Sequence, residues 1–181
     1  MPKDEFTLPT GEKVSLIYGA KHPAKGAAYL SAVRMHPVNE KSAMAIEYRA
    51  MEKTYSLQLA THVKNEVPDF DAVVSPPSSR SDADPYRQAI LHLCSVLDLT
   101  SHFSRQGRLK IGHNGTTLKQ AIDEIIYTKD GTEADIKSLL IVDETIATGK
   151  TVAAILHHMR EAGLSEDCKV TVVAWARVDD L

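Results

Sequence analysis

Two adjacent carboxylates stand directly before a turn that is suited to holding a phosphate. Asp143 and Glu144 follow an apolar run at residues 138–142, and residues 145–151 (TIATGKT) lead from them into a helical pattern. Backbone N–H groups at the start of a helix favour an anion, whereas a nearby carboxylate repels it. We therefore expect the two acids to face a different part of the ligand from the phosphate.

A sugar phosphate reconciles the acids with the turn. Carboxylates accept hydrogen bonds from the two hydroxyls of a vicinal diol, and threonine hydroxyls can donate to phosphate oxygens. The turn contains three such hydroxyls, on Thr145, Thr148 and Thr151. The ligand implied by these residue types is a ribose 5-phosphate group, which carries a phosphate at one end and a diol on one side.

Two other interpretations of this stretch stay open. The letters GKT before a helix also end the phosphate-binding loop of NTPases, G-x-x-x-x-G-K-[ST]. The first glycine of that motif would fall at Glu144, where an acid would face the polyphosphate, so an NTPase is the weaker alternative. The acids could instead be ordinary residues near a helix that Thr148 caps, which leaves the apolar strand and Gly149 unexplained.

Residues 139–151 (LLIVDETIATGKT) resemble the phosphoribosyl pyrophosphate signature of type I phosphoribosyltransferases: an apolar strand, two acids, variable residues and Thr-Gly-x-Thr. The resemblance implies an α/β fold of that family, with a mostly parallel central sheet flanked by helices and a small N-terminal or hood region. By it, Asp143 and Glu144 would hold the ribose 2′- and 3′-hydroxyls. The 5′-phosphate would be bound by Thr145, Ala147, Thr148, Gly149, Lys150 and Thr151.

A second loop, at residues 75–80 (SPPSSR), follows an earlier apolar strand and precedes a helix. This layout resembles the pyrophosphate loop of ComF-like members of the family, as does the closing stretch VTVVAWARV. Those members usually carry an N-terminal zinc ribbon, which Cys94 and Cys168 cannot build. Read alone, SPPSSR is also an ordinary polar turn. The resemblance implies that pyrophosphate is bound by Ser75, Ser78, Ser79 and the fixed cation Arg80.

Residues 104–115 (SRQGRLKIGHNG) are basic and rich in glycine, at the place where the family has a flexible hood loop. A solvated basic loop is an equal alternative. Trp175 ends the last predicted strand and could stack on an acceptor ring, or belong to the core. Closure of the hood would bring four side chains to the pyrophosphate: Arg105, Arg108, Lys110 and His113.

The resemblance implies an enzyme that moves the phosphoribosyl group from phosphoribosyl pyrophosphate to a base or amine nitrogen, with Mg²⁺ and release of pyrophosphate. A non-catalytic protein that binds phosphoribosyl pyrophosphate or a nucleotide is the alternative. The 6-oxopurine enzymes of the family have an aspartate where Ala147 stands, so those acceptors are disfavoured. His157 and His158 lack a third ligand at a matching spacing for a metal. Residues 1–65 are expected to shape the acceptor pocket.

The elements that position these residues follow from hydrophobic periodicity. Strands alternate with helices, which predicts a largely parallel α/β sheet with ligands at the carboxyl ends of its strands. A turn is expected at residues 19–26 and a loop at 104–117. Strands are predicted at residues 13–18, 27–35, 71–75, 100–103, 138–142 and 169–175, and helices at 40–64, 84–99, 118–126 and 151–163.

The bulk composition sets the remaining expectations. A chain of 181 residues fits a single domain, over 1–181, in which about 1–38 could form the hood or acceptor region. A net charge of −3 offers no general attraction to nucleic acid or to an anionic membrane. The N-terminal residues contain no apolar signal segment, and a cytosolic protein with reduced thiols is expected. A homodimer is common in the resembled family.

Overall fold

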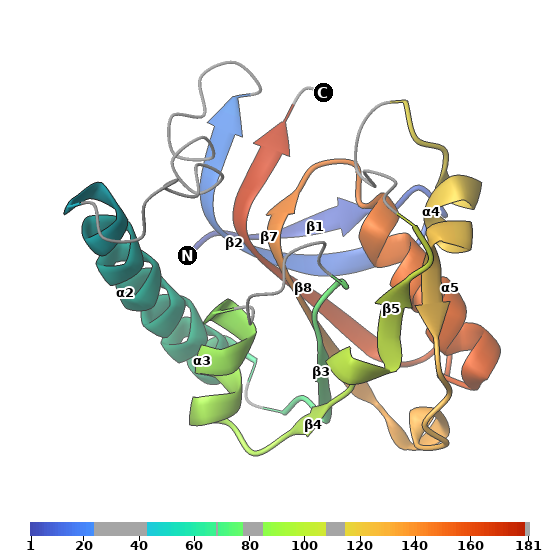
Figure 1. Ribbon diagram of the computed structural model, residues 1–181. Coiled ribbons are helices and arrows are strands. Elements are labelled where there is room, and N and C mark those ends of the chain that lie inside the picture. Colours follow the sequence, from blue (N-terminus) through green and yellow to red (C-terminus); the bar gives the residue numbers. More distant parts are fainter. Residues whose placement is uncertain (24–42, 68, 78–84, 108–114, 180–181) are drawn as a thin grey trace.

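The strand that was predicted at residues 138–142 lies inside a six-stranded sheet (Figure 1). The computed structural model describes residues 1–23, 43–67, 69–77, 85–107 and 115–179. The sheet has the order β1-β2-β8-β7-β3-β4, and only β1 runs antiparallel to its neighbour. Its strands are β1 (Lys3–Thr7), β2 (Lys13–Pro23), β3 (Ala72–Val74), β4 (Leu97–Asp98), β7 (Ser138–Ile146) and β8 (Lys169–Asp179).

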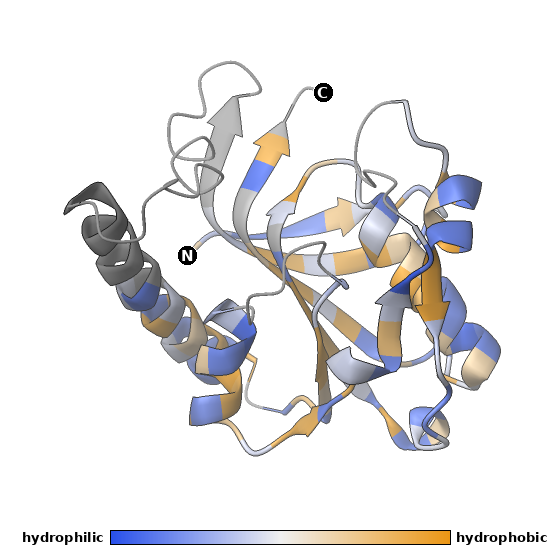
Figure 2. Ribbon diagram, viewed as in Figure 1, coloured by the Kyte–Doolittle hydropathy of each residue, from blue (hydrophilic) through white to orange (hydrophobic). Residues whose placement is uncertain are grey.

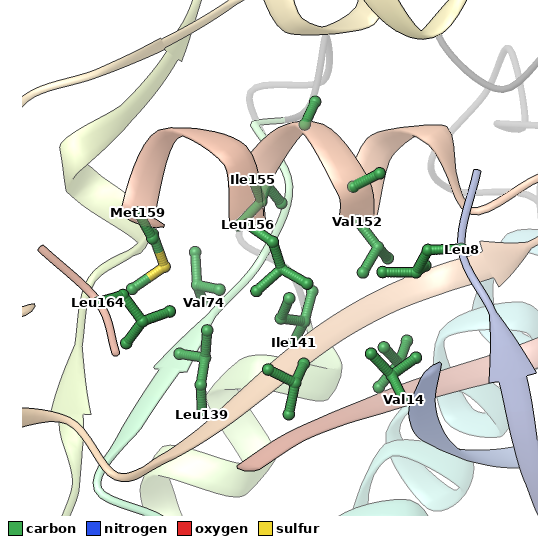
Figure 3. Packing of buried hydrophobic residues seen from close by; sticks show 14 of the residues in the cluster. Leu8, Val14, Val74, Leu139, Ile141, Val152, Ile155, Leu156, Met159 and Leu164 are labelled. Carbon is green, nitrogen blue, oxygen red and sulfur yellow. The ribbon is translucent and has the colours of Figure 1, made fainter. Parts of the chain in front are cut away.

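Helices cover both faces of the sheet, as the alternation of side chains along β7 requires. Leu139 and Ile141 pack in a cluster with the helices α4 (Leu118–Glu124) and α5 (Lys150–Ala162), as Figure 3 shows for α5. Leu140 and Val142 pack on the other face, with the helices α2 (Ala43–Glu66) and α3 (Pro85–Leu93). Figure 2 shows the hydrophobic residues concentrated in the central strands. The predicted α/β fold with a mostly parallel sheet is confirmed.

A small second sheet stands beside α4 and α5. It consists of β5 (Phe103–Arg105) and β6 (Ile125–Tyr127), which run antiparallel. Two single-turn 3₁₀ helices, η1 (Thr100–His102) and η2 (Glu133–Asp135), precede β5 and β7. Glu133 is buried in η2, where it accepts hydrogen bonds from the Tyr127 hydroxyl and from two backbone N–H groups. Burial raises the pKa of the Glu133 carboxyl, but these hydrogen bonds outweigh that effect and lower it overall.

The first strands differ from the prediction. The strand β1 was not predicted, and β2 continues through Pro23, so residues 19–23 are extended rather than a turn. Parallel pairing with β8 persists as far as Pro23 and Asp179, which keeps this stretch in the sheet. The predicted strand at 27–35 and the expected helix start at residues 40–42 lie outside the described residues.

Two predicted helices were too long. Pairing with β3 turns Leu97 and Asp98 into β4, so the helix predicted to reach residue 99 ends at Leu93. Ile125 and Ile126 belong to β6 rather than to the preceding helix, because they pair with β5. Residues 100–102, which were predicted as strand, form η1 instead. For β4 and β6, contacts between distant segments override the local helical pattern.

Among the described residues, the structure contains no helix with the length and apolar character needed to cross a membrane.

Candidate functional site

The two acids lie within a strand rather than after it. The strand β7 continues to Ile146 because β8 runs beside it, pairing Asp143 with Ala174 and Thr145 with Ala176. Side chains alternate along a strand, so Asp143 shares a face with Ile141, which packs in the cluster that contains α5. The Asp143 side chain is half-buried. The backbone of Glu144 is in the same strand, but its side chain lies outside the described residues.

Gly149 joins β7 to α5 through a left-handed backbone conformation. Its φ is +70°, and its carbonyl accepts a hydrogen bond from Ala153 N at 2.9 Å, in the first turn of the helix. A Cβ at this position would lie 2.7 Å from Phe6 Cε1 and 3.0 Å from Leu8 Cδ2. Both the conformation and the lack of space therefore require glycine.

Thr148, one residue earlier, presents an unusual hydroxyl. Its Oγ1 atom is buried, yet within the described part of the chain it has no hydrogen-bond partner. The N-cap of α5 is Gly149, and the Thr148 hydroxyl makes no capping bond, so the interpretation of Thr148 as a helix cap is wrong. Buried polar atoms are nearly always satisfied, and this one lies next to a helix N-terminus. It therefore suits an oxygen of an anionic ligand. Its neighbours in the chain are half-buried: Thr145, Ala147, Lys150 and Thr151.

The predicted pyrophosphate loop begins at the same edge of the sheet. The strand β3 pairs in parallel with β7, with Val74 opposite Ile141, so Ser75 lies beside the strand that contains Asp143. Ser75 is buried, and its backbone N–H donates to Thr100 Oγ1 at 2.9 Å. The Ser75 amide therefore already donates a hydrogen bond within the protein. Ser78, Ser79 and Arg80 lie outside the described residues.

Three residues that support this loop were not predicted. Asp98 accepts a hydrogen bond from the Thr100 backbone N–H at 3.0 Å and forms an ion pair with Arg87 of α3. Thr100 in turn holds the backbone of Ser75. The short spacing from Asp98 to Thr100 is typical of a local turn, but the contact with Arg87 depends on how α3 packs and has no signal in the sequence.

The hood prediction is only partly described. Arg105 lies in β5, and its Nε and Nη2 atoms are each 3.2 Å from Glu124 Oε1. Glu124 is buried at the end of α4. Arg105 was predicted to be in a loop and to supply charge to the ligand. The structure instead places it in a strand, paired with a buried carboxylate. Arg108, Lys110 and His113 lie outside the described residues.

The remaining candidates are spread over two elements. Trp175 lies inside β8 rather than at its end, and its side chain is outside the described residues. His158 Nε2 is 3.1 Å from the carbonyl oxygen of Ile122, and His157 Nε2 is 3.5 Å from Glu161 Oε1. The described part of the chain contains no group of three or more His, Cys, Asp or Glu side chains that could hold a metal.

Comparisons with known proteins show little beyond the course of the chain. No protein-family model matches it, and no curated protein matches it. One solved structure that it resembles is described as the allosteric regulatory enzyme of purine biosynthesis, with a TM-score of 0.47 and 14% identity. The match covers 68% of this chain but only 25% of that chain. A likeness at this level carries no conclusion about ligand or activity, and the resemblance to ComF-like proteins stays a prediction.

Proposed function

We propose that the chain binds phosphoribosyl pyrophosphate and transfers its phosphoribosyl group to a base or amine nitrogen, with release of pyrophosphate. One observation supports this most: the buried Thr148 hydroxyl without a described partner lies beside the left-handed Gly149 turn, directly after the strand that contains Asp143. The turn is suited to a phosphate and the acid to a diol. A ribose 5-phosphate group has both, at its two ends.

Each of the two loops at this edge would bind a different end of the ligand. The turn at 145–151 would bind the 5′-phosphate, and the neighbouring loop that starts at Ser75 would bind the pyrophosphate. Because β3 and β7 are adjacent and parallel, both loops leave the sheet at its carboxyl edge. One ligand with phosphate groups at both ends of a ribose would therefore span them.

The proposed reaction breaks the bond between C1 of the ribose and the pyrophosphate oxygen, through a state with oxocarbenium character. The bonding electron pair leaves with pyrophosphate, the lone pair of the acceptor nitrogen forms the new bond to C1, and the proton that this nitrogen loses passes to solvent. No covalent intermediate with the protein is needed. The contribution of the chain is to hold the phosphate, the diol and the leaving group in position.

Mg²⁺ is the ion expected with this ligand. It would enter with phosphoribosyl pyrophosphate rather than bind directly to protein side chains, and a hard cation of this kind keeps several waters. When bound, Mg²⁺ would offset the negative charge that grows on the departing pyrophosphate. The residues Asp143 and Glu144 would orient the ribose hydroxyls next to it.

A screen for pyrophosphate release tests the proposal. The chain is incubated with phosphoribosyl pyrophosphate, Mg²⁺ and a panel of nucleobases and amines, and inorganic pyrophosphate is measured. We expect release with at least one acceptor, and none from the Asp143→Asn, Glu144→Gln variant. Binding of phosphoribosyl pyrophosphate without release under any acceptor would favour a non-catalytic binding protein. Tight binding of ATP with no binding of phosphoribosyl pyrophosphate would favour an NTPase.

Arg80→Ala is expected to weaken pyrophosphate binding more than ribose 5-phosphate binding. Arg80 follows Ser75 in the predicted pyrophosphate loop, and loss of its fixed charge should cost that end of the ligand about tenfold in affinity, or about 1.4 kcal/mol. Isothermal titration with each ligand measures the difference. Lys119→Ala, which removes an exposed cation on α4, is the control. Equal losses for both ligands would show that the loop is misassigned.

A further inference from the structure

We propose that the N-terminal hairpin, formed by β1 and β2, sets the shape of the phosphate-binding turn, with Phe6 as a positioning residue. This rests on the proposed function of that turn. Phe6 and Leu8 fill the space in which a Gly149 side chain would lie, with Phe6 Cε1 only 2.7 Å from the position of its Cβ. The hairpin and the turn are more than a hundred residues apart in the chain, yet the ring packs directly on the backbone of the turn.

A charged cluster contacts the Phe6 ring on the same face of the hairpin, because Asp4 and Phe6 alternate to one side of β1. Arg177, near the end of β8, lies with its Cζ atom 5.8 Å from the Phe6 ring centroid. Its Nη1 donates to Asp4 Oδ2 at 2.9 Å, and the Tyr18 hydroxyl donates to the same oxygen at 2.8 Å. The Tyr18 ring centroid is 5.9 Å from the guanidinium. These contacts, including cation–π contacts, restrict how far the ring can move.

The position of Arg177 links this cluster to the turn a second time. In the pairing of β7 with β8, Arg177 stands opposite Ile146, which is the last residue of β7 and already belongs to the turn at 145–151. In the pairing of β2 with β8 it stands opposite Lys21. Arg177 thus lies on the strand between the hairpin and the turn, and contacts the aromatic ring that touches Gly149.

The hairpin also contacts the helix α5 near both of its ends. Figure 3 shows Leu8 beside Val152, in the first turns of the helix. Further along the hairpin, Glu12 Oε1 accepts from Arg160 Nη2 at 2.9 Å, in the last turn of α5. Contacts near both ends of the helix fix its direction relative to the hairpin, and therefore the direction in which its N-terminal amides point.

These contacts matter for binding because the turn acts through backbone amides. Backbone donors must lie within about 0.5 Å of their productive positions to bind a phosphate well. A glycine in the left-handed region has few restraints of its own, so the restraint must come from what packs on it. Phe6 supplies that packing, and its loss would leave the turn to be ordered by the ligand at a cost in affinity.

The test compares two equal truncations. Phe6→Leu removes the ring beside Gly149, and Phe70→Leu removes a buried ring from the cluster on the α2 and α3 face. Ribose 5-phosphate is titrated into each folded variant by calorimetry, and thermal unfolding is recorded. We expect about tenfold weaker binding for Phe6→Leu. Both variants should lose stability, but Phe70→Leu should bind as tightly as the unchanged chain.

Further variants keep the inference testable if Phe6→Leu does not fold. Phe6→Tyr retains the ring and should keep the affinity. Arg177→Met leaves the ring but removes its cation, and should weaken binding about threefold. The role of the hairpin would be overturned if Phe6→Leu bound ribose 5-phosphate as tightly as Phe70→Leu. Equal affinities for Arg177→Met and the unchanged chain would also overturn it. Neither result would contradict the proposed function. If the unchanged chain does not bind ribose 5-phosphate, the proposed function fails first and this inference with it.

Discussion

Replacing Asp143 by Asn together with Glu144 by Gln is expected to weaken the binding of phosphoribosyl pyrophosphate at least tenfold and to abolish pyrophosphate release. Asparagine and glutamine keep nearly the same shape but carry no charge, and hydrogen bonds to charged groups are the stronger ones. The acids would hold the ribose hydroxyls, so the loss should be about 1.4 kcal/mol of binding free energy or more. Calorimetric titration with Mg²⁺ measures it.

The fold should survive this double change. Asp143 is only half-buried, at the carboxyl edge of the sheet, where the backbone pairing with Ala174 does not depend on its side chain. A matched control is Glu166→Gln with Asp167→Asn, a second pair of adjacent acids that lies on the exposed surface near the amino end of β8. The control should bind normally. Unchanged affinity in the Asp143 and Glu144 variant would remove both acids from the site.

Gly149→Ala is expected to lower both stability and affinity. A side chain at φ +70° costs about 1–2 kcal/mol. The new methyl group would also lie 2.7 Å from Phe6 Cε1, so the ring or the turn must shift. Forced overpacking of this kind costs a further 1–3 kcal/mol, roughly. We therefore expect a loss of about 2–5 kcal/mol in the free energy of unfolding, measured by urea denaturation.

The displaced turn should also bind ribose 5-phosphate more than tenfold more weakly. Gly163→Ala separates the effect of backbone strain from that of the clash with Phe6. Gly163, at the other end of α5, has φ +121° but nothing within 4 Å of its Cβ position. That variant should show the backbone strain without the clash, and should bind normally. Gly149→Ala with normal affinity and stability would mean that the turn tolerates a side chain and is not held as we describe.

Several elements could be predicted because their signals are local. The run at 139–142 is apolar throughout, which is typical of a strand buried on both faces of a sheet. The periodicity at 151–163 and the terminal glycine are enough to define α5 within a residue. The position of the turn at 145–151 follows from these two elements. Its composition alone therefore led to Gly149 and Thr148, whose surroundings are unusual: Gly149 has no room for a side chain, and the buried Thr148 hydroxyl has no partner among the described residues.

The predictions for other elements were wrong because the secondary structure of these segments depends on contacts with distant residues. Leu97 and Asp98 extend a helical pattern and become strand only through pairing with β3. Ile125 and Ile126 likewise leave the helix to pair with β5. Arg105 has the composition of a loop cation, and nothing near it in the chain indicates that Glu124 will be its partner. Local propensity is a weak guide where tertiary pairing competes with it.

The sequence by itself predicted the α/β class, the alternation of strands and helices that gives a parallel sheet, and the chemistry expected of the acids and the turn. Those properties depend on residue types and spacings within about fifteen residues, over which hydrophobic periodicity is informative. Only the tertiary structure decided that β1 exists, that Arg87, Asp98 and Thr100 support Ser75, and that Phe6 packs on Gly149. Except for the β1–β2 hairpin and the bond from Thr100 to Asp98, these are contacts between segments far apart in the chain, and they form because burial and register select them.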